Sequence, residues 1–134
     1  MTVLYDAGLL IAADRGNREV WADHRPRLEL GVVPVTAAPV VSQVSRSSRQ
    51  VQLGRLLRGC EIVAFSPEEV HEVGELLGRA GSSDVVDAHA VLTASRRGSS
   101  VITSDEDDLG RLSNCLQQPV AIHQVGTRRR PRQR

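Results

Sequence analysis

Short runs of β-branched and apolar residues alternate with helical patterns along almost the whole chain. Strand-like runs occur at five places: residues 2–5, 32–36, 60–65, 100–104 and 119–125. Amphipathic helical patterns lie between them, at residues 7–15, 17–31, 37–48, 49–59, 66–81, 82–98 and 105–112. Strands that alternate with helices need crossover connections, which produce a parallel sheet covered on both faces. We therefore expect an α/β fold: a single three-layer α/β/α domain with a mostly parallel sheet of about five strands.

The end of the chain differs sharply in composition from the rest. Residues 128–134, RRRPRQR, carry five arginines and no acid. We expect a disordered Arg-rich tail there, since such a segment has nothing to bury, and one domain over residues 1–127. Because the 134-residue chain has a net charge of +1, the body without the tail has about four more acids than bases. A mildly acidic body is not the usual footprint of a general nucleic-acid binder.

Composition also argues against several other classes of protein. One Tyr, one Trp and one Phe are too few for an aromatic platform that stacks single-stranded bases. The two cysteines, Cys60 and Cys115, form neither a disulfide framework nor a metal-ligand spacing, which favours a reduced, cytoplasmic setting. No apolar run approaches the roughly 18 residues of a membrane span, and no signal-peptide pattern opens the chain, so we expect no membrane partner.

Particular residues mark the boundaries of two helices. Pro26 predicts a break or a new start within the second helical pattern, because proline cannot continue the helical hydrogen bonding. The helix over residues 82–98 is expected to begin with Ser82 or Ser83 as its cap. Asp84 then falls in the first turn, where the helix dipole favours an acid.

Acidic residues follow two of the predicted strands at the point where each strand ends. Asp6 ends the first strand-like run, and Asp105 ends the fourth, as the first acid of the run SDEDDL. In an open parallel sheet, ligands bind just beyond the carboxyl ends of the strands. Each of these aspartates has a second possible role, as the cap of the helix that follows, and for either residue alone both roles stay open.

Asp87 lies one turn inside a helical pattern, on the same stripe as Val91 and Ala94. An ionised carboxylate against a packed face costs roughly several kcal/mol unless it meets a cation or a full set of hydrogen bonds. We therefore favour a ligand or catalytic role for Asp87. His89, two residues further along, falls off this stripe and is expected to be a structural histidine.

Three carboxylates that converge from separate elements repel one another, and such a cluster persists mainly where a divalent cation neutralises it. Oxygen-only ligands favour a hard ion, Mg²⁺ or Mn²⁺. Hydrolysis of a phosphodiester by a metal-activated water suits such a pocket. The spacing of the acids leaves other magnesium-dependent phosphate chemistry open.

Four segments in this order resemble the PIN domain of VapC-type toxins: VLYDAGLLIAADR, VPVTAAPVVSQVSR, SSDVVDAHAVLTASRRG and VITSDEDDL. The resemblance runs from Val3 to about Val125 and implies a small α/β/α sandwich. It implies an endoribonuclease that depends on Mg²⁺ or Mn²⁺, cleaves tRNA, rRNA or mRNA, and is inhibited by a cognate VapB-like antitoxin. We also expect a homodimer.

The resemblance assigns roles to four aspartates. It implies that Asp6 and Asp87 are the principal metal ligands and that Asp105 completes the catalytic cluster. Asp108 is a second-rank metal ligand, able to reach the ion or to orient Asp105. A metal-bound water would attack phosphorus in line and leave a 5′-phosphate and a 3′-hydroxyl.

The second motif departs from the family, since Gln43 stands where a glutamate is usual and no acid occurs between Glu29 and Glu61. Glutamine can still hold a water or offer its carbonyl oxygen, but it removes one negative charge and any acceptance of a proton. We therefore keep Gln43 in the catalytic set. The alternative is a non-catalytic or weakly active PIN-like module that binds RNA or an antitoxin.

Four further residues near this edge are candidates for binding substrate. Arg15 and Arg46 are placed to hold phosphate, although ordinary solvated arginines remain the simpler alternative. Thr103 and Ser104 can hydrogen-bond a ligand, or they simply end the strand.

Overall fold

Our computed structural model describes residues 2–106 and 108–126, so the predicted tail and Asp107 lie outside the described residues. Five strands form its sheet: β1 (Val3–Tyr5), β2 (Val35–Ala37), β3 (Glu61–Val63), β4 (Ser100–Thr103) and β5 (Ile122–Gln124). The helices in chain order are α1 (Ala7–Asp14), α2 (Arg18–Glu29), α3 (Ala38–Val44), α4 (Val51–Arg58), the 3₁₀ turn η1 (Pro67–Glu69), α5 (Val70–Ala80), α6 (Val85–Arg97) and α7 (Leu109–Asn114).

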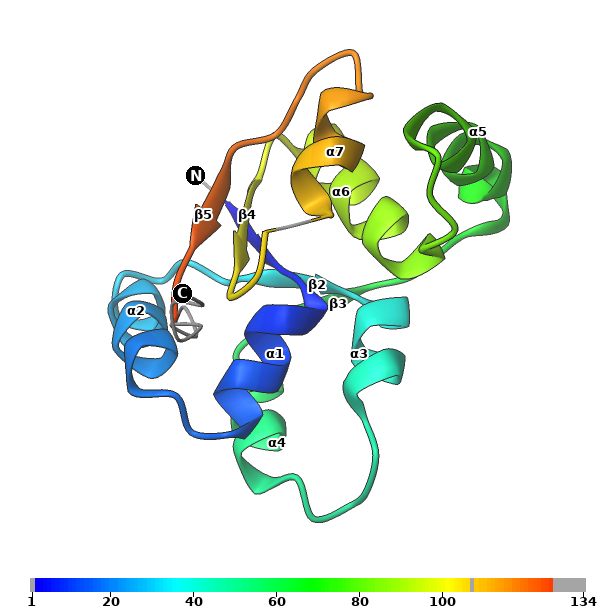
Figure 1. The fold of residues 1–134 in the computed structure, drawn as a ribbon. Helices are drawn as coiled ribbons and strands as arrows, with labels where there is room; N and C mark the ends of the chain where they lie inside the picture. The colour runs from blue at the N-terminus through cyan, green and yellow to red at the C-terminus, as the bar shows by residue number, and fades with distance from the viewer. Residues whose placement is uncertain (1, 107, 127–134) are drawn as a thin grey trace, which may run out of the picture.

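All pairings in the sheet are parallel, and the strand order is β3-β2-β1-β4-β5. β1 is therefore central, with Leu4 opposite Val35 on one side and Val101 on the other. Helices α1, α2 and α4 lie on one side of the sheet, and α5, α6 and α7 lie on the other (Figure 1). The predicted α/β/α sandwich with a parallel sheet of five strands is confirmed. None of the described helices is long and apolar enough to cross a membrane.

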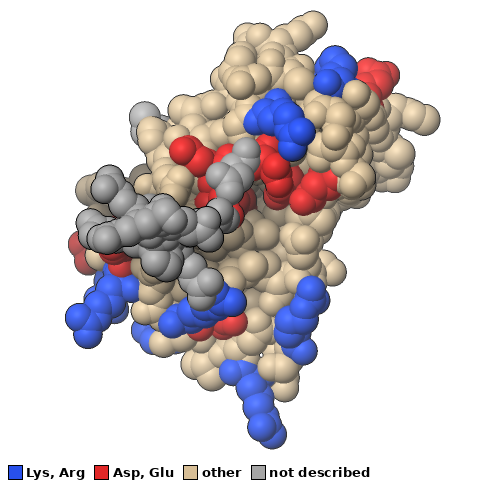
Figure 2. Space-filling view, in the orientation of Figure 1, with Lys and Arg blue, Asp and Glu red and all other residues tan. Residues whose placement is uncertain are grey.

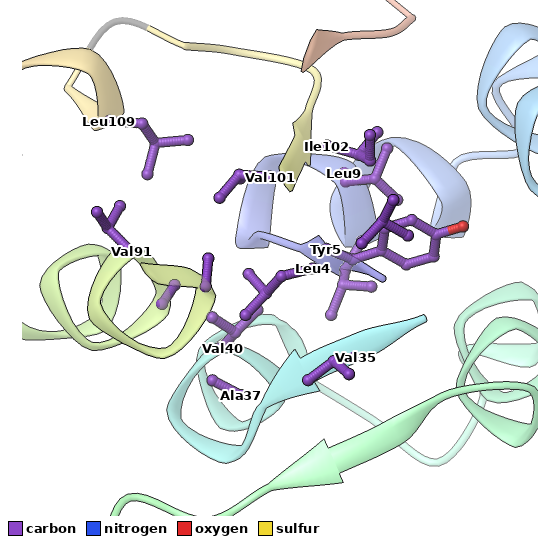
Figure 3. Close-up of a cluster of buried hydrophobic side chains, with 14 of the residues drawn as sticks. Leu4, Tyr5, Leu9, Val35, Ala37, Val40, Val91, Val101, Ile102 and Leu109 are labelled. Carbon is purple, nitrogen blue, oxygen red and sulfur yellow. The ribbon is translucent and has the colours of Figure 1, made fainter. Parts of the chain in front are cut away.

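The central strands are buried on both faces, which explains their continuous apolar sequence. Val3, Leu4 and Tyr5 of β1 are all buried, and so are Val101 and Ile102 of β4. Side chains from the helices close around them (Figure 3), including Leu9, Val40, Val91 and Leu109.

Helix α2 runs through Pro26 without interruption, so the predicted break was wrong. Contacts on both sides of the proline hold the helix in place. Before it, Nδ1 of buried His24 is hydrogen-bonded to the Tyr5 hydroxyl over 2.7 Å, and after it Arg27 donates to the same hydroxyl oxygen over 3.2 Å. Proline supplies no N–H to the carbonyl of Ala22 one turn earlier. Ala22 and Pro26 are both exposed, and water can satisfy that carbonyl.

Leu4→Ala and Leu30→Ala form a matched test of this core. Leu4 is fully buried in β1, whereas Leu30, at the end of α2, is 80% exposed. We expect Leu4→Ala to lower the free energy of unfolding by about 2–5 kcal/mol, because a cavity remains in the sheet core. Leu30→Ala should change it by about 0.5 kcal/mol or less. Urea denaturation measures both, and equal losses would contradict the described core.

Candidate active site

The carboxyl ends of β1 and β4 open into a pocket of about 710 Å³. The order in which strands are added reverses here. The chain places β2 and β3 on one side of β1 and then returns to place β4 on the other side of β1. Open α/β sheets bind their ligands at such a switch point. Acidic side chains gather on this face (Figure 2). Six of the described aspartates line the pocket: Asp6, Asp14, Asp84, Asp87, Asp105 and Asp108.

Asp6 lies directly after β1 and caps α1. Its backbone N–H donates to the carbonyl of Ile102 over 3.4 Å, which extends the pairing with β4 by one residue. Its Oδ1 accepts the N–H of Leu9 over 2.9 Å, and its Oδ2 accepts the hydroxyl of Thr103 over 2.6 Å. Burial raises the pKa of Asp6 to about 6, although both hydrogen bonds oppose the shift. The capping role is therefore real, and the same buried carboxylate lines the pocket.

The hydroxyl of Thr103 connects the ends of β1 and β4. It lies 2.6 Å from Asp6 Oδ2 and 2.8 Å from the carbonyl oxygen of Asp105. A hydroxyl has one proton, and donation to the ionised carboxylate gives the stronger bond. Thr103 is fully buried, and neither it nor Ser104, which donates to the carbonyl of Gly8 over 2.8 Å, lines the pocket. Both residues lie behind the pocket, where they fix Asp6 and the start of α1.

Two aspartates at the start of α6 line the same pocket. Asp84 is the N-cap, since its Oδ1 accepts the N–H of Asp87 over 3.0 Å. The prediction of Ser82 or Ser83 as the cap was wrong. The free N–H in the first turn belongs to Asp87, and the residue three positions before it is Asp84. Ser82 instead accepts the N–H of Asp84 over 3.1 Å. Burial raises the pKa of Asp87 to about 7, and the negative charges of Asp84 and Asp6 add to the shift.

Two more aspartates reach the pocket from the segment between β4 and α7. Asp105 lies two residues after the end of β4 and is exposed at the pocket. Asp108 lies just before α7, where its Oδ1 accepts from Arg111 over 3.2 Å. Glu106 does not line the pocket. Of the described acids in this run, Asp105 and Asp108 line the pocket with the other aspartates.

The opposite wall comes from α1, from α3 and from the loop before α4. Gln43 is exposed on α3 and lines the pocket, and so do Arg15 and Arg46. Sequence reasoning missed two residues of this wall, Asp14 and Gln50. The two side chains are hydrogen-bonded to each other, since Gln50 Nε2 donates to Asp14 Oδ2 over 3.0 Å.

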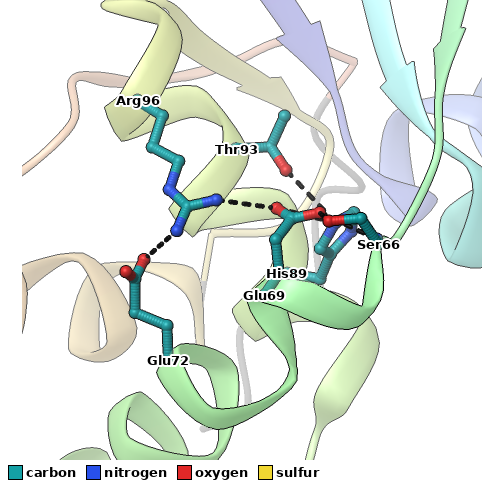
Figure 4. A network of polar contacts seen from close by, with 6 residues as sticks. All are labelled: Ser66, Glu69, Glu72, His89, Thr93 and Arg96. Atoms are coloured by element: carbon teal, nitrogen blue, oxygen red, sulfur yellow. Dashed lines mark hydrogen bonds and ion pairs between the residues drawn. The ribbon is translucent and has the colours of Figure 1, made fainter.

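A polar network holds α6 against η1 and α5 (Figure 4). Glu69 accepts the N–H and the hydroxyl of Ser66 over 2.9 and 3.0 Å, and Arg96 donates to it over 3.1 Å. His89 is fully buried, with Nε2 3.5 Å from Glu69 Oε2 and its ring stacked on Phe65 at a centroid distance of 4.4 Å. Burial lowers the pKa of His89, so the ring is neutral at neutral pH. The structural role predicted for His89 is confirmed, and the network fixes the helix that carries two of the aspartates.

The chemistry of this pocket suits a hard divalent cation, because carboxylate and amide oxygens are its main donors. The raised pKa values of Asp6 and Asp87 show that burial and like charge disfavour full ionisation without a counter-charge. Within residues 2–106 and 108–126, no three Asp, Glu, His or Cys side chains are already arranged as a metal site. The residues fit a cation by type and location.

Comparisons with known proteins agree with this fold. The family model described as PIN domain matches residues 3–114, which is most of the chain. A comparison with curated proteins found no match. The sheet and helices are similar to those of several solved structures at low sequence identity, which shows a shared fold.

Three of these structures come from different organisms. VapBC2 from Rickettsia felis, bound to a DNA fragment from their promoter, matches with a TM-score of 0.68 and 17% identity over 92% of this chain and 98% of that chain. PAE2754 from Pyrobaculum aerophilum matches with a TM-score of 0.63 and 16% identity over 92% and 83% of the two chains. A toxin–antitoxin complex from Klebsiella pneumoniae matches with a TM-score of 0.62 and 22% identity over 79% and 88%.

The raised pKa of Asp87 predicts how stability depends on pH in a solution without divalent cations. The usual value of 3.8 applies to the unfolded chain and about 7 to the folded one, so the folded protein binds the proton more tightly. Stability conferred by this proton is complete below pH 4 and is lost as the pH rises to about 7. Asp87→Asn should remove the part of the pH dependence that comes from Asp87, while Asp6, whose pKa is also raised, keeps its own part. At pH 8 the substitution should raise the free energy of unfolding by an amount on the order of 1 kcal/mol, because water screens this half-exposed group.

Thermal denaturation between pH 4 and 8 measures this effect, with chelator present throughout. Glu75→Gln, on the exposed surface of α5, is the control for the loss of one negative charge and should leave the pH dependence unchanged. An Asp87→Asn protein no more stable than the parent at pH 8 would contradict the assigned burial and charge crowding.

Thr103→Val tests the link between β1 and β4. Valine keeps the shape but removes the donor to Asp6, so stability should fall by about 1–3 kcal/mol and the pKa of Asp6 should rise further. Thr36→Val is the matched control, because Thr36 is equally buried but donates to the carbonyl of Tyr5 over 2.9 Å. It should cost stability without moving the Asp6 pKa, which NMR titration of the carboxyl carbon measures.

Proposed function

This chain belongs to the PIN domain family, and we propose that it is a metal-dependent endoribonuclease toxin whose activity is inhibited by a cognate VapB-like antitoxin. PIN domains are generally nucleases that use divalent metal ions. One observation carries the proposal: aspartates from three separate parts of the chain line a single pocket at the switch point of the sheet. Carboxylates crowded in this way are stable as charged groups mainly beside a cation.

Asp6 and Asp87 would be the principal ligands of Mg²⁺ or Mn²⁺, with Asp105 completing the set and Asp108 in support. The cation would offset the charge of an RNA phosphate and activate water for attack on phosphorus. The water oxygen bonds to phosphorus as the bond to the 3′ oxygen breaks, and a proton ends on that oxygen. The products are a 5′-phosphate and a 3′-hydroxyl. Arg15 and Arg46 would hold phosphate oxygens at the rim of the pocket.

The names of the similar structures support an antitoxin as partner. VapBC2 from Rickettsia felis and the complex from Klebsiella pneumoniae are toxin–antitoxin assemblies by name. We propose that this chain likewise pairs with an antitoxin and acts on tRNA, rRNA or mRNA in the cytoplasm. A homodimer is the expected assembly, which analytical ultracentrifugation would test.

The decisive experiment incubates the purified protein, free of antitoxin, with total RNA and either Mg²⁺ or Mn²⁺. We expect discrete cleavage with 5′-phosphate ends and none in the presence of chelator. Asp6→Asn and Asp87→Asn should each lower the rate at least about 100-fold. Asp23→Asn is the matched control, because Asp23 pairs with Arg27 on α2, away from the pocket, and should leave the rate unchanged. If no divalent metal supports cleavage, the proposal is wrong, and a non-catalytic module that binds RNA or an antitoxin is favoured.

Gln43→Glu tests whether the missing charge limits metal binding. A carboxylate at this wall of the pocket should tighten Mn²⁺ binding by about fivefold or more, through added Coulomb attraction. Gln52→Glu introduces the same charge on α4 without entering the pocket and should not change the affinity. Calorimetric titration with Mn²⁺ measures both, and identical curves for the parent and Gln43→Glu would count against a role for residue 43 at the ion.

A further inference from the structure

A second pocket, of about 340 Å³, lies where the turn after α1 meets α2 and α4. Three arginines and the single tryptophan of the chain line it: Arg18, Trp21, Arg25 and Arg55. Gly16 and Gln52 line it as well, and none of the described residues that line it is acidic. We call this the arginine pocket, and we call the pocket lined by the six aspartates at the ends of β1 and β4 the aspartate pocket. The two pockets have opposite charges.

The arginines of this pocket form no ion pair with an acidic side chain within the described residues, and the same is true of Arg15, Arg46, Arg49, Arg58 and Arg79. In the described part of the chain, Arg27, Arg96, Arg97 and Arg111 each form an ion pair with an Asp or Glu side chain. None of the ion pairs found there involves an arginine of the pocket. Exposed guanidinium groups without carboxylate partners are available to bind an anion.

Trp21 gives the pocket a fixed floor. Its Nε1 donates to the carbonyl of Ala13 over 3.0 Å, and its ring meets His24 edge-on at a centroid distance of 5.7 Å. The guanidinium of Arg55 lies over the same ring, 5.6 Å from its centroid, and also donates to Gln52 Oε1 over 3.4 Å. An arginine held against an aromatic ring loses less freedom when it binds a phosphate.

Two segments connect this arginine pocket to the aspartate pocket. Arg15 lines the aspartate pocket, and its neighbour Gly16, at a φ of 75° that suits glycine, lines the arginine pocket. Around the start of α4, Gln50 lines the aspartate pocket and Gln52 lines the arginine pocket. A flexible polyanion that reaches the aspartates past Arg15 therefore arrives at the second pocket next.

We propose that the arginine pocket binds the phosphodiester backbone of single-stranded RNA at nucleotides away from the scissile bond. The proposal rests on the proposed function, and it adds a binding subsite outside the cleavage pocket. A row of phosphates matches separate, unpaired arginines, and a polyanion can span two neighbouring pockets. The subsite raises affinity for longer RNA and leaves the chemical step unchanged.

The lone tryptophan makes this pocket directly observable. With chelator present to prevent cleavage, the full-length protein is titrated with a single-stranded RNA of about 12 nucleotides and with a dinucleotide of the same chemistry. The longer RNA should change Trp21 fluorescence in a saturable way, and the dinucleotide should not. A response to a glutamate-rich peptide but none to RNA would overturn the proposal in favour of an acidic protein partner.

Arg25→Gln combined with Arg55→Gln should weaken binding of the longer RNA about tenfold. The same double variant should reduce the slope of affinity against salt by about 0.7 for each phosphate that the protein no longer neutralises. Arg58→Gln is the matched single-charge control, because Arg58 is exposed on α4 but does not line the pocket. It should leave the fluorescence response intact, and its effect on affinity should be under about twofold.

Cleavage assays separate this subsite from the active site. For long RNA, the double variant should raise KM and keep kcat, whereas for short RNA both constants should match the parent. Unchanged binding and KM with normal cleavage would overturn the subsite alone. A protein that binds the longer RNA through Trp21 but cleaves nothing would support the subsite and overturn the proposed nuclease.

Discussion

The Thr103 hydroxyl donates to the Asp6 carboxylate where the two central strands, β1 and β4, end side by side. The other oxygen of Asp6 caps α1, so one buried carboxylate connects β1, the neighbouring strand β4 and the helix α1 that follows β1. Gly8 completes this junction, since a Cβ there would lie 3.1 Å from the Ser104 hydroxyl. The pocket has its position because these backbones meet, and the carboxylate that joins them also faces the cleft.

This arrangement costs stability, and the rest of the fold compensates for the cost. The pKa values of Asp6 and Asp87 are raised to about 6 and about 7. At neutral pH the ionised forms of these neighbouring carboxylates therefore lower the stability of the folded state. The buried strands and the network around Glu69 keep α6 in place despite that repulsion. Sites that bind ions or substrates often hold groups in arrangements that are unfavourable when the site is empty.

The order of strands and helices could be predicted from the sequence because each short apolar run forms a strand, buried in β1, β2 and β4 and more exposed at the edges in β3 and β5. The acids after β1 and β4 could be placed for the same reason, since parallel strands end at one edge. Asp14 was missed, although Ala7, Ile11 and Asp14 follow the i, i+4, i+7 spacing of one helix face and all line the pocket. The course of α2 through Pro26 depends on contacts with Tyr5 from a different element, which no local pattern contains.

Net charge was the least informative quantity in the sequence, because it averages over surfaces with opposite roles. A body with excess acid argues against a general nucleic-acid binder, yet the described acids of the aspartate pocket and the arginines of the neighbouring pocket occupy separate places. Crowded carboxylates repel an RNA backbone, and an ion that neutralises them serves only the phosphates it touches. Attraction for the remaining phosphates has to come from cations outside the acidic pocket. The arginines of the arginine pocket, on α2 and α4, are located where they can bind the phosphates of an RNA chain that passes Arg15.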